Sequence, residues 1–189
     1  MTGVLEWGRL LDEQLSWWWH GHLRPRMAGL TDAEYFWEAA PGAWSVRRLG
    51  ASAAAAGAAG SGEFRVDFAF PQPDPPPVTT IAWRLAHLIV GVFGARAAAH
   101  FGGPPCDYGT FPYAGTADGA LAQLDAAYGG WSAGVRALGD GGLARPCGPA
   151  EGPYGDRPMA ELVLHINREA LHHGAEIALL RDLYRARGG

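Results

Sequence analysis

The chain has 189 residues, 48% of them hydrophobic, and a formal net charge of −4 at pH 7. This length suits one domain with a sizeable core, which we expect to span residues 1–189. The acidic balance and the lack of any basic run interleaved with aromatic residues argue against a nucleic-acid partner. All 15 basic residues are Arg, so no lysine is present for a Schiff base or a phosphate-binding loop.

Four long segments show the apolar spacing of amphipathic helices. We expect helices over residues 5–27, 79–101, 116–138 and 157–187. Thr79 or Thr80 suits the N-cap of the second helix, and Gly102-Gly103-Pro104 ends it. Helices of this number and length predict an all-α fold, a four-helix bundle.

The connections between these segments differ in length. The first two helices are joined by a crossover of about 50 residues, which we expect to let them run in the same direction. Within it, Glu63 to Phe70 has Phe or Val at every second position, which predicts a short strand. The loops over residues 102–115 and 139–156 are rich in Gly and Pro, and we expect them to form pocket walls.

The first residues contain neither a basic region nor a long apolar run of the kind found in secretion signals. The most apolar stretch, residues 81–101, is interrupted by Arg84, His87, Arg96 and His100. A membrane span would not carry so many polar groups, so this stretch predicts a buried helix. We therefore expect a soluble, cytoplasmic protein with no membrane partner.

The fourth predicted helix carries a stripe of His and Glu side chains beside its apolar face. Four residues project within an arc of about 60°: His165, Glu169, His172 and Glu176. Imidazoles and carboxylates are costly to bury unless they pair or hold a metal. Together with His87 in the apolar second helix, the stripe favours a shared metal or catalytic site. The alternative is a solvated helix face with satisfied core histidines.

Three segments in order resemble the DinB/YfiT-like superfamily. They are Leu23 to Trp37 followed by Pro41-Gly-Ala-Trp-Ser-Val46, then Trp83-Arg-Leu-Ala-His-Leu88, then Asn167-Arg-Glu-Ala-Leu-His-His-Gly174. The resemblance covers nearly the whole chain. It implies a four-helix bundle with a long crossover between helices 1 and 2. In typical members it also implies a divalent metal (zinc, nickel or iron) held by one His of the second helix and a His-x-x-x-His pair of the fourth.

Matched position by position, His87 corresponds to the second-helix ligand and His172 to the second ligand of the fourth helix. The first ligand of that helix falls on Arg168, and a guanidinium does not ligate a metal. Two alternatives stay open. In one, the third ligand comes from the same stripe: Glu169, His165 or Glu176. In the other, the site holds no metal and Arg168 binds an anionic group.

Known branches of the superfamily include thiol-dependent transferases and isomerases. The resemblance therefore implies a metal-dependent enzyme acting on a small molecule with a low-molecular-weight thiol of the mycothiol type as cosubstrate. Arg84, Arg168 and Trp44 are the residues we expect to contact a substrate. The alternative is a non-catalytic relative without metal, which binds a small ligand or acts as a homodimer.

Overall fold

The computed structural model describes residues 5–51 and 57–188, and most of these are helical. The four predicted helices are present, with ends within a few residues of the expected ones. The first and second are built from consecutive pieces that include π-helical turns, η1 and η2. Their bounds are α1 Trp7–Trp18, η1 Trp19–Leu23 and α2 Arg24–Arg26, then α4 Ile81–Ala86, η2 His87–Gly94 and α5 Ala95–Phe101, then α6 Ala117–Arg136 and α8 Met159–Ala186.

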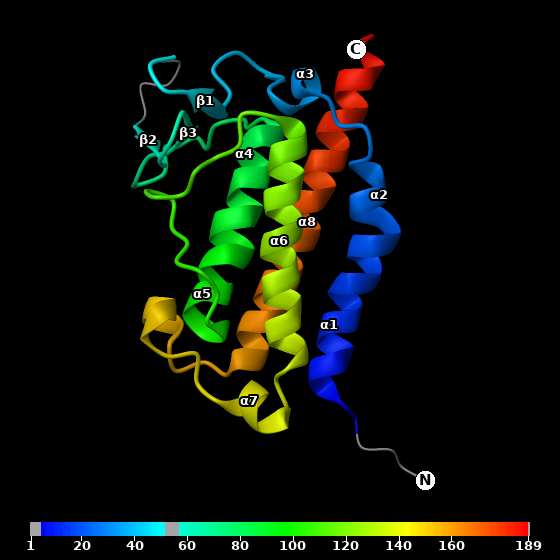
Figure 1. Ribbon diagram of the computed structural model, residues 1–189, viewed down its shortest axis with the longest axis vertical. Helices are drawn as coiled ribbons and strands as arrows, with labels where there is room; N and C mark the ends of the chain where they lie inside the picture. Colours follow the sequence, from blue (N-terminus) through cyan, green and yellow to red (C-terminus); the bar gives the residue numbers. More distant parts are fainter. Residues whose placement is uncertain (1–4, 52–56, 189) are drawn as a thin grey trace.

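Contacts near the helix ends show the relative direction of α1 and α6. Gly8, at the start of α1, lies against the Leu138 carbonyl just beyond the end of α6. Arg24, at the other end of the first segment, forms a two-pronged ion pair with Asp125 in the first half of α6. The first segment and α6 are therefore antiparallel (Figure 1).

The second segment runs parallel to α6. Phe93 packs on Tyr128, and Phe101, eight residues further along, packs on Trp131. The expectation that the first two helices run in the same direction is therefore wrong: α1 is antiparallel to the α4 to α5 segment (Figure 1). Because the second segment and α6 run parallel, the connection between them, residues 102–116, must return along the molecule. It is long enough, since about 15 extended residues span about 50 Å, more than the length of a 20-residue helix.

The long crossover folds into a short helix and a small sheet at one end of the helices (Figure 1). The helix α3, Asp32–Tyr35, begins with a capping box made by Thr31 and Glu34. The strands are β1 Val46–Arg48, β2 Ala58–Ala59 and β3 Phe64–Asp67, paired antiparallel in the order β1-β3-β2. The strand expected between Glu63 and Phe70 is thus present. It lies at the centre of a small sheet, which the prediction of an all-α fold does not include.

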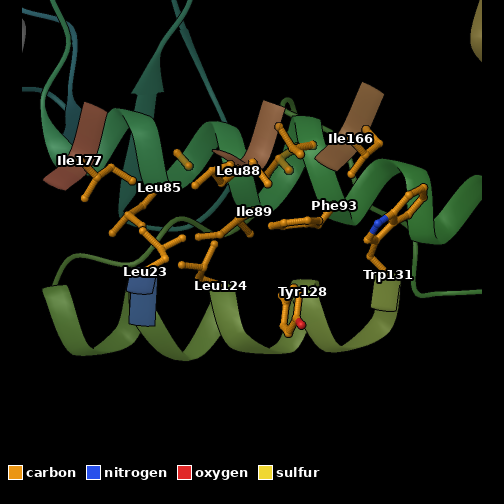
Figure 2. Close-up of a cluster of buried hydrophobic side chains, with 14 of the residues drawn as sticks. Leu23, Leu85, Leu88, Ile89, Phe93, Leu124, Tyr128, Trp131, Ile166 and Ile177 are labelled. Atoms are coloured by element: carbon orange, nitrogen blue, oxygen red, sulfur yellow. The ribbon is translucent and has the colours of Figure 1, made fainter. Parts of the chain in front are cut away.

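The core lies between the long helical segments (Figure 2). Trp19 of η1 stacks on Tyr128 of α6 with ring centres 3.9 Å apart. Burying each large apolar side chain contributes about 1.5–3 kcal/mol. Side chains from every long segment meet there: Leu23, Leu85, Leu88, Ile89, Phe93, Leu124, Trp131, Ile166 and Ile177. Because α8 buries its predicted apolar face, its His and Glu residues lie at the edge of this core.

The segment Ile81–Phe101 is long and apolar enough to cross a membrane, but 56% of its most apolar 18-residue stretch, whose mean hydropathy is 1.3, is buried inside the protein. It packs on both α6 and α8. This is the environment of a buried core helix, as the sequence predicts. The loop between α6 and α8 contains the helix α7, Asp140–Ala144, and the 3-10 helix η3, Pro149–Tyr154.

Candidate metal centre

His87 is the first residue of η2, a π-helical stretch inside the second segment. Such stretches are rare and often occur at functional sites. The imidazole stacks on Trp83 with ring centres 5.5 Å apart. Burial, with the nearby His173 and Arg84 adding to it, lowers the pKa of His87 to about 3. The ring is therefore neutral at pH 7, as a metal ligand must be.

Tyr108 holds the other side of the His87 ring. Its hydroxyl lies 2.6 Å from Nδ1 of His87, and burial raises the pKa of Tyr108, so the hydroxyl keeps its proton. A glycine makes this approach possible, because a Cβ on Gly91 would lie 2.2 Å from the tyrosine oxygen. With Nδ1 engaged by Tyr108, Nε2 is the nitrogen of His87 that remains for a ligand.

His173 brings α8 into the same site. Its side chain is only 9% exposed, and its ring meets that of His87 edge to face, with centres 4.6 Å apart. Nε2 of His173 lies 3.4 Å from a carboxylate oxygen of Glu169, one turn earlier on the helix. One donor atom from each of His87, Glu169 and His173 lies within 4.8 Å of the other two. We call these three residues the His87 cluster.

Outside the cluster, a carboxylate and a guanidinium fix the orientation of His173. Nδ1 of His173 lies 2.7 Å from Oε2 of Glu176, and Nε of Arg84 lies 3.1 Å from the same oxygen. Arg84 also comes within 3.3 Å of Nδ1, but the carboxylate of Glu176 is nearer and only accepts, so Nδ1–H donates to Glu176. This arrangement leaves the lone pair of His173 Nε2 facing Glu169.

A second group of donors, His172, His173 and Glu176, also lies within 4.8 Å. It is a weaker metal site because Arg84 is already paired with Glu176, and a second cation there would be repelled at short range. His172 is 63% exposed and lies 3.4 Å from Glu176. The His87 cluster is more buried and joins two helices, so we take it as the candidate metal centre.

Comparison with protein families identifies the superfamily of this chain. The sequence model of the DinB superfamily matches residues 65–177, more than half of the chain, and the match includes every residue of the His87 cluster. The chain belongs to the DinB superfamily. No curated protein and no solved structure gives a significant match. The resemblance drawn from the sequence motifs is thus confirmed.

In this DinB superfamily protein the residues of the cluster fit a divalent metal. Two imidazoles and one carboxylate form the donor set of catalytic zinc sites and of non-haem iron sites, and imidazole also suits nickel. Three protein donors leave coordination positions open for a substrate. The cluster departs from the three-His set of typical members by one residue, Glu169, which is itself a metal ligand in many proteins.

The remaining residues of the predicted site lie around the cluster or away from it. His165 is half exposed, 3.8 Å from Glu169, and its Nδ1 lies 3.0 Å from the exposed guanidinium of Arg168. Arg84 is paired with Glu176, as described above. Trp44 is buried with its ring centre 6.0 Å from that of Trp83, so it supports the helix that carries His87. Of the expected substrate contacts, only Arg168 extends into solvent.

The sequence motifs predict His172 as the second ligand of the fourth helix, whereas in the structure His173 lies beside His87. Helical periodicity contained the signal: at about 100° per residue, His173 projects between Leu162 and Ile166, in the middle of the apolar arc. When the second ligand of the fourth helix moves by one residue, from His172 to His173, the first ligand of that pair moves from Arg168 to Glu169. Tyr108, in a loop, carried no comparable signal.

Proposed function

We propose that this protein is a metal-dependent enzyme in which His87, Glu169 and His173 hold one divalent ion, with zinc, nickel and iron as candidates. The observation that carries the proposal is the convergence of three donor atoms within 4.8 Å from two helices, with the orientation of both histidines held by neighbours. The proposal includes the four-helix bundle of the superfamily, formed by the four long helical segments as a single cytoplasmic domain.

The nucleophile is proposed to come from a cosubstrate. The chain has two free cysteines, Cys106 and Cys147, and burial raises the pKa of both thiols. A thiol with a raised pKa supplies little thiolate at neutral pH and is a poor nucleophile. A divalent ion supplies positive charge that stabilises the thiolate of a low-molecular-weight thiol. This supports S-transfer or isomerisation with a thiol of the mycothiol type.

Each neighbouring residue then has a role that follows from its contacts. Tyr108 positions His87 through Nδ1, and Glu176 positions His173 in the same way. Arg84 neutralises Glu176, so its charge acts on the ligand shell instead of on a substrate. The catalytic groups in this proposal are the three members of the cluster, and the other residues keep them in place.

A thiol-consumption assay tests the proposal. Protein purified without a His tag is loaded with zinc, nickel or iron, and mixed with a generic electrophile and a panel of thiols that includes mycothiol. We expect thiol-dependent turnover above the no-enzyme control, with its loss in His173→Ala and its retention in His172→Ala. Turnover equal to the control across the panel, with metal present in the protein, would instead favour a non-catalytic, ligand-binding protein.

A further inference from the structure

A separate cavity lies between η3 and the first half of α8. Its volume is about 640 Å³, within the range of small-molecule sites in proteins. Arg96 of α5, the η3 residues Pro153 and Tyr154, and the α8 residues Leu164 and Arg168 line it. We call it the η3 cavity.

The η3 wall of this cavity is held in place by buried charge. The Glu151 carboxylate, 7% exposed, lies 3.3 Å from the guanidinium of Arg96 and 2.9 Å from Nε2 of His100, which is 3% exposed. Backbone hydrogen bonds from Cys147 to Arg157 and from Gly148 to Gly155 close the same loop. The cavity is thus formed by the fold itself, and a ligand would not have to order the wall.

The lining has an excess of one positive charge, because it contains three arginines, Arg96, Arg157 and Arg168, and two carboxylates, Glu151 and Glu161. Arg168 contacts the imidazole of His165 at 3.0 Å, and no carboxylate of the described residues lies within 4.0 Å of it. Among the described residues, Glu161 is the one carboxylate within 4.0 Å of Arg157, at 3.9 Å. Both side chains are more than half exposed, so this pairing has little energetic weight. The guanidinium Nε of Arg96 is buried without a hydrogen-bond partner among the described residues.

An apolar surface faces these cations. Leu164 and Tyr154 remain 52% and 65% exposed, and Leu162 continues the lining at the base of α8. An exposed leucine and tyrosine beside two under-paired guanidiniums form a surface complementary to a molecule with an apolar body and one anionic group.

We propose that the η3 cavity binds a small organic anion. Arg168 and Arg157 hold its carboxylate or phosphate group, and its apolar part lies against Leu164 and Tyr154. This goes beyond the metal-dependent activity, because none of the three ligands of the His87 cluster lines the cavity. The two sites are nevertheless neighbours, since His165 lines the cavity and lies 3.8 Å from Glu169.

Titration of metal-free, full-length protein with matched probes tests this proposal. The probes are 4-phenylbutanoate, phenyl phosphate and the neutral 4-phenylbutanamide, followed by calorimetry and by amide chemical shifts. We expect saturable binding of at least one anion, at least about tenfold tighter than that of the amide. The shift changes should centre on η3 and residues 161–168. The relative affinities of the two anions tell whether the site prefers a carboxylate or a phosphate.

Three variants complete the test. Arg168→Gln should weaken anion binding at least about tenfold. Arg48→Gln, which changes another exposed arginine whose partner Glu63 is also exposed, should leave it unchanged. His87→Ala should also leave it unchanged, so that failure of the metal proposal and failure of this one are distinguishable. Equal binding by Arg168→Gln and Arg48→Gln, equal binding of the amide and the anions, or no saturable binding at millimolar concentration would overturn the proposal.

Discussion

The imidazole rings of His87 and His173 meet edge to face, with centres 4.6 Å apart and planes at 89°. One comes from η2 and the other from α8, so the site exists only when these two helical segments are packed together. Binding a metal between them should therefore stabilise the folded chain, because the unfolded chain does not hold the donors in place.

Metal should raise the thermal stability of this protein by an amount that grows with the logarithm of the free metal concentration divided by the dissociation constant. At a free metal concentration about 1,000 times the dissociation constant, the gain in unfolding free energy is about 4 kcal/mol. Calorimetric melting with and without a chelator measures it. The variant His87→Ala serves as the control, and an equal gain in melting temperature for this variant and wild type would show that the metal binds elsewhere.

Gly91→Ala tests whether Tyr108 positions the metal ligand. The new methyl group would lie 2.2 Å from the tyrosine oxygen and 3.1 Å from Nδ1 of His87, so the tyrosine must move away. Loss of such an outer partner typically lowers metal affinity about 10- to 100-fold. Gly129→Ala, in an open position of α6, is the matched control and should leave affinity unchanged. The same affinity in both variants would contradict a positioning role for Tyr108.

Glu169→His tests the identity of the third ligand. This substitution places a third imidazole at the position that typical superfamily members use, and we expect metal affinity within about tenfold of wild type. Glu169→Ala removes the donor and should cost at least about 100-fold, more than the loss of an outer partner. Metal titrations of the two variants compare them directly. If Glu169→Ala binds as tightly as wild type, the carboxylate is not a ligand.

Glu34 and Arg181 form a buried ion pair that should make stability depend on pH. Their two hydrogen bonds are 3.0 and 3.1 Å long. Burial alone raises the pKa of Glu34, but hydrogen bonds from Arg181 and from the Thr31 backbone outweigh it, and the pKa is lowered. The stabilisation by this carboxylate is therefore complete above its unfolded pKa of 4.5 and is lost as pH falls through the lower, folded value.

Glu34→Gln should accordingly destabilise the protein at pH 7 by about 3–5 kcal/mol, because Arg181 loses its charged partner in the interior. Urea unfolding at several pH values measures this. The difference in unfolding free energy between variant and wild type should narrow as the pH falls below the pKa of the Glu34 carboxyl in the unfolded chain. Glu63→Gln, an exposed partner of Arg48, should change little. A gap that stays constant from neutral to acid pH would show that the charge of Glu34 is not what stabilises the fold.

The positions of the helices could be predicted from the sequence because each long segment repeats apolar residues at helical spacing. The relative directions of the helices could not be predicted. No local sequence pattern distinguishes a long connection that returns along the molecule from one that folds at one end of the helices. The small sheet was predicted only through β3, whose alternation is clear. Its partner strands β1 and β2 are two or three residues long, too short for a pattern.

The candidate site was predicted in location but not in detail. His87 and the stripe of α8 were found because polar groups beside an apolar face are conspicuous. The choice between His172 and His173 depended on the motif register, and adjacent residues on a helix differ by about 100° in direction. Tyr108 reaches His87 from a loop whose path depends on tertiary packing, so no sequence periodicity could indicate it.

The comparison of His173→Ala with His172→Ala decides which histidine of α8 binds the metal. The two residues are neighbours of the same type, yet one is buried against His87 and the other is 63% exposed. Calorimetric titration of each metal-free variant with zinc is the measurement. We expect His173→Ala to lose at least about 100-fold in zinc affinity and His172→Ala to bind zinc like wild type. Equal affinities in the two variants, or a larger loss in His172→Ala, would contradict this expectation.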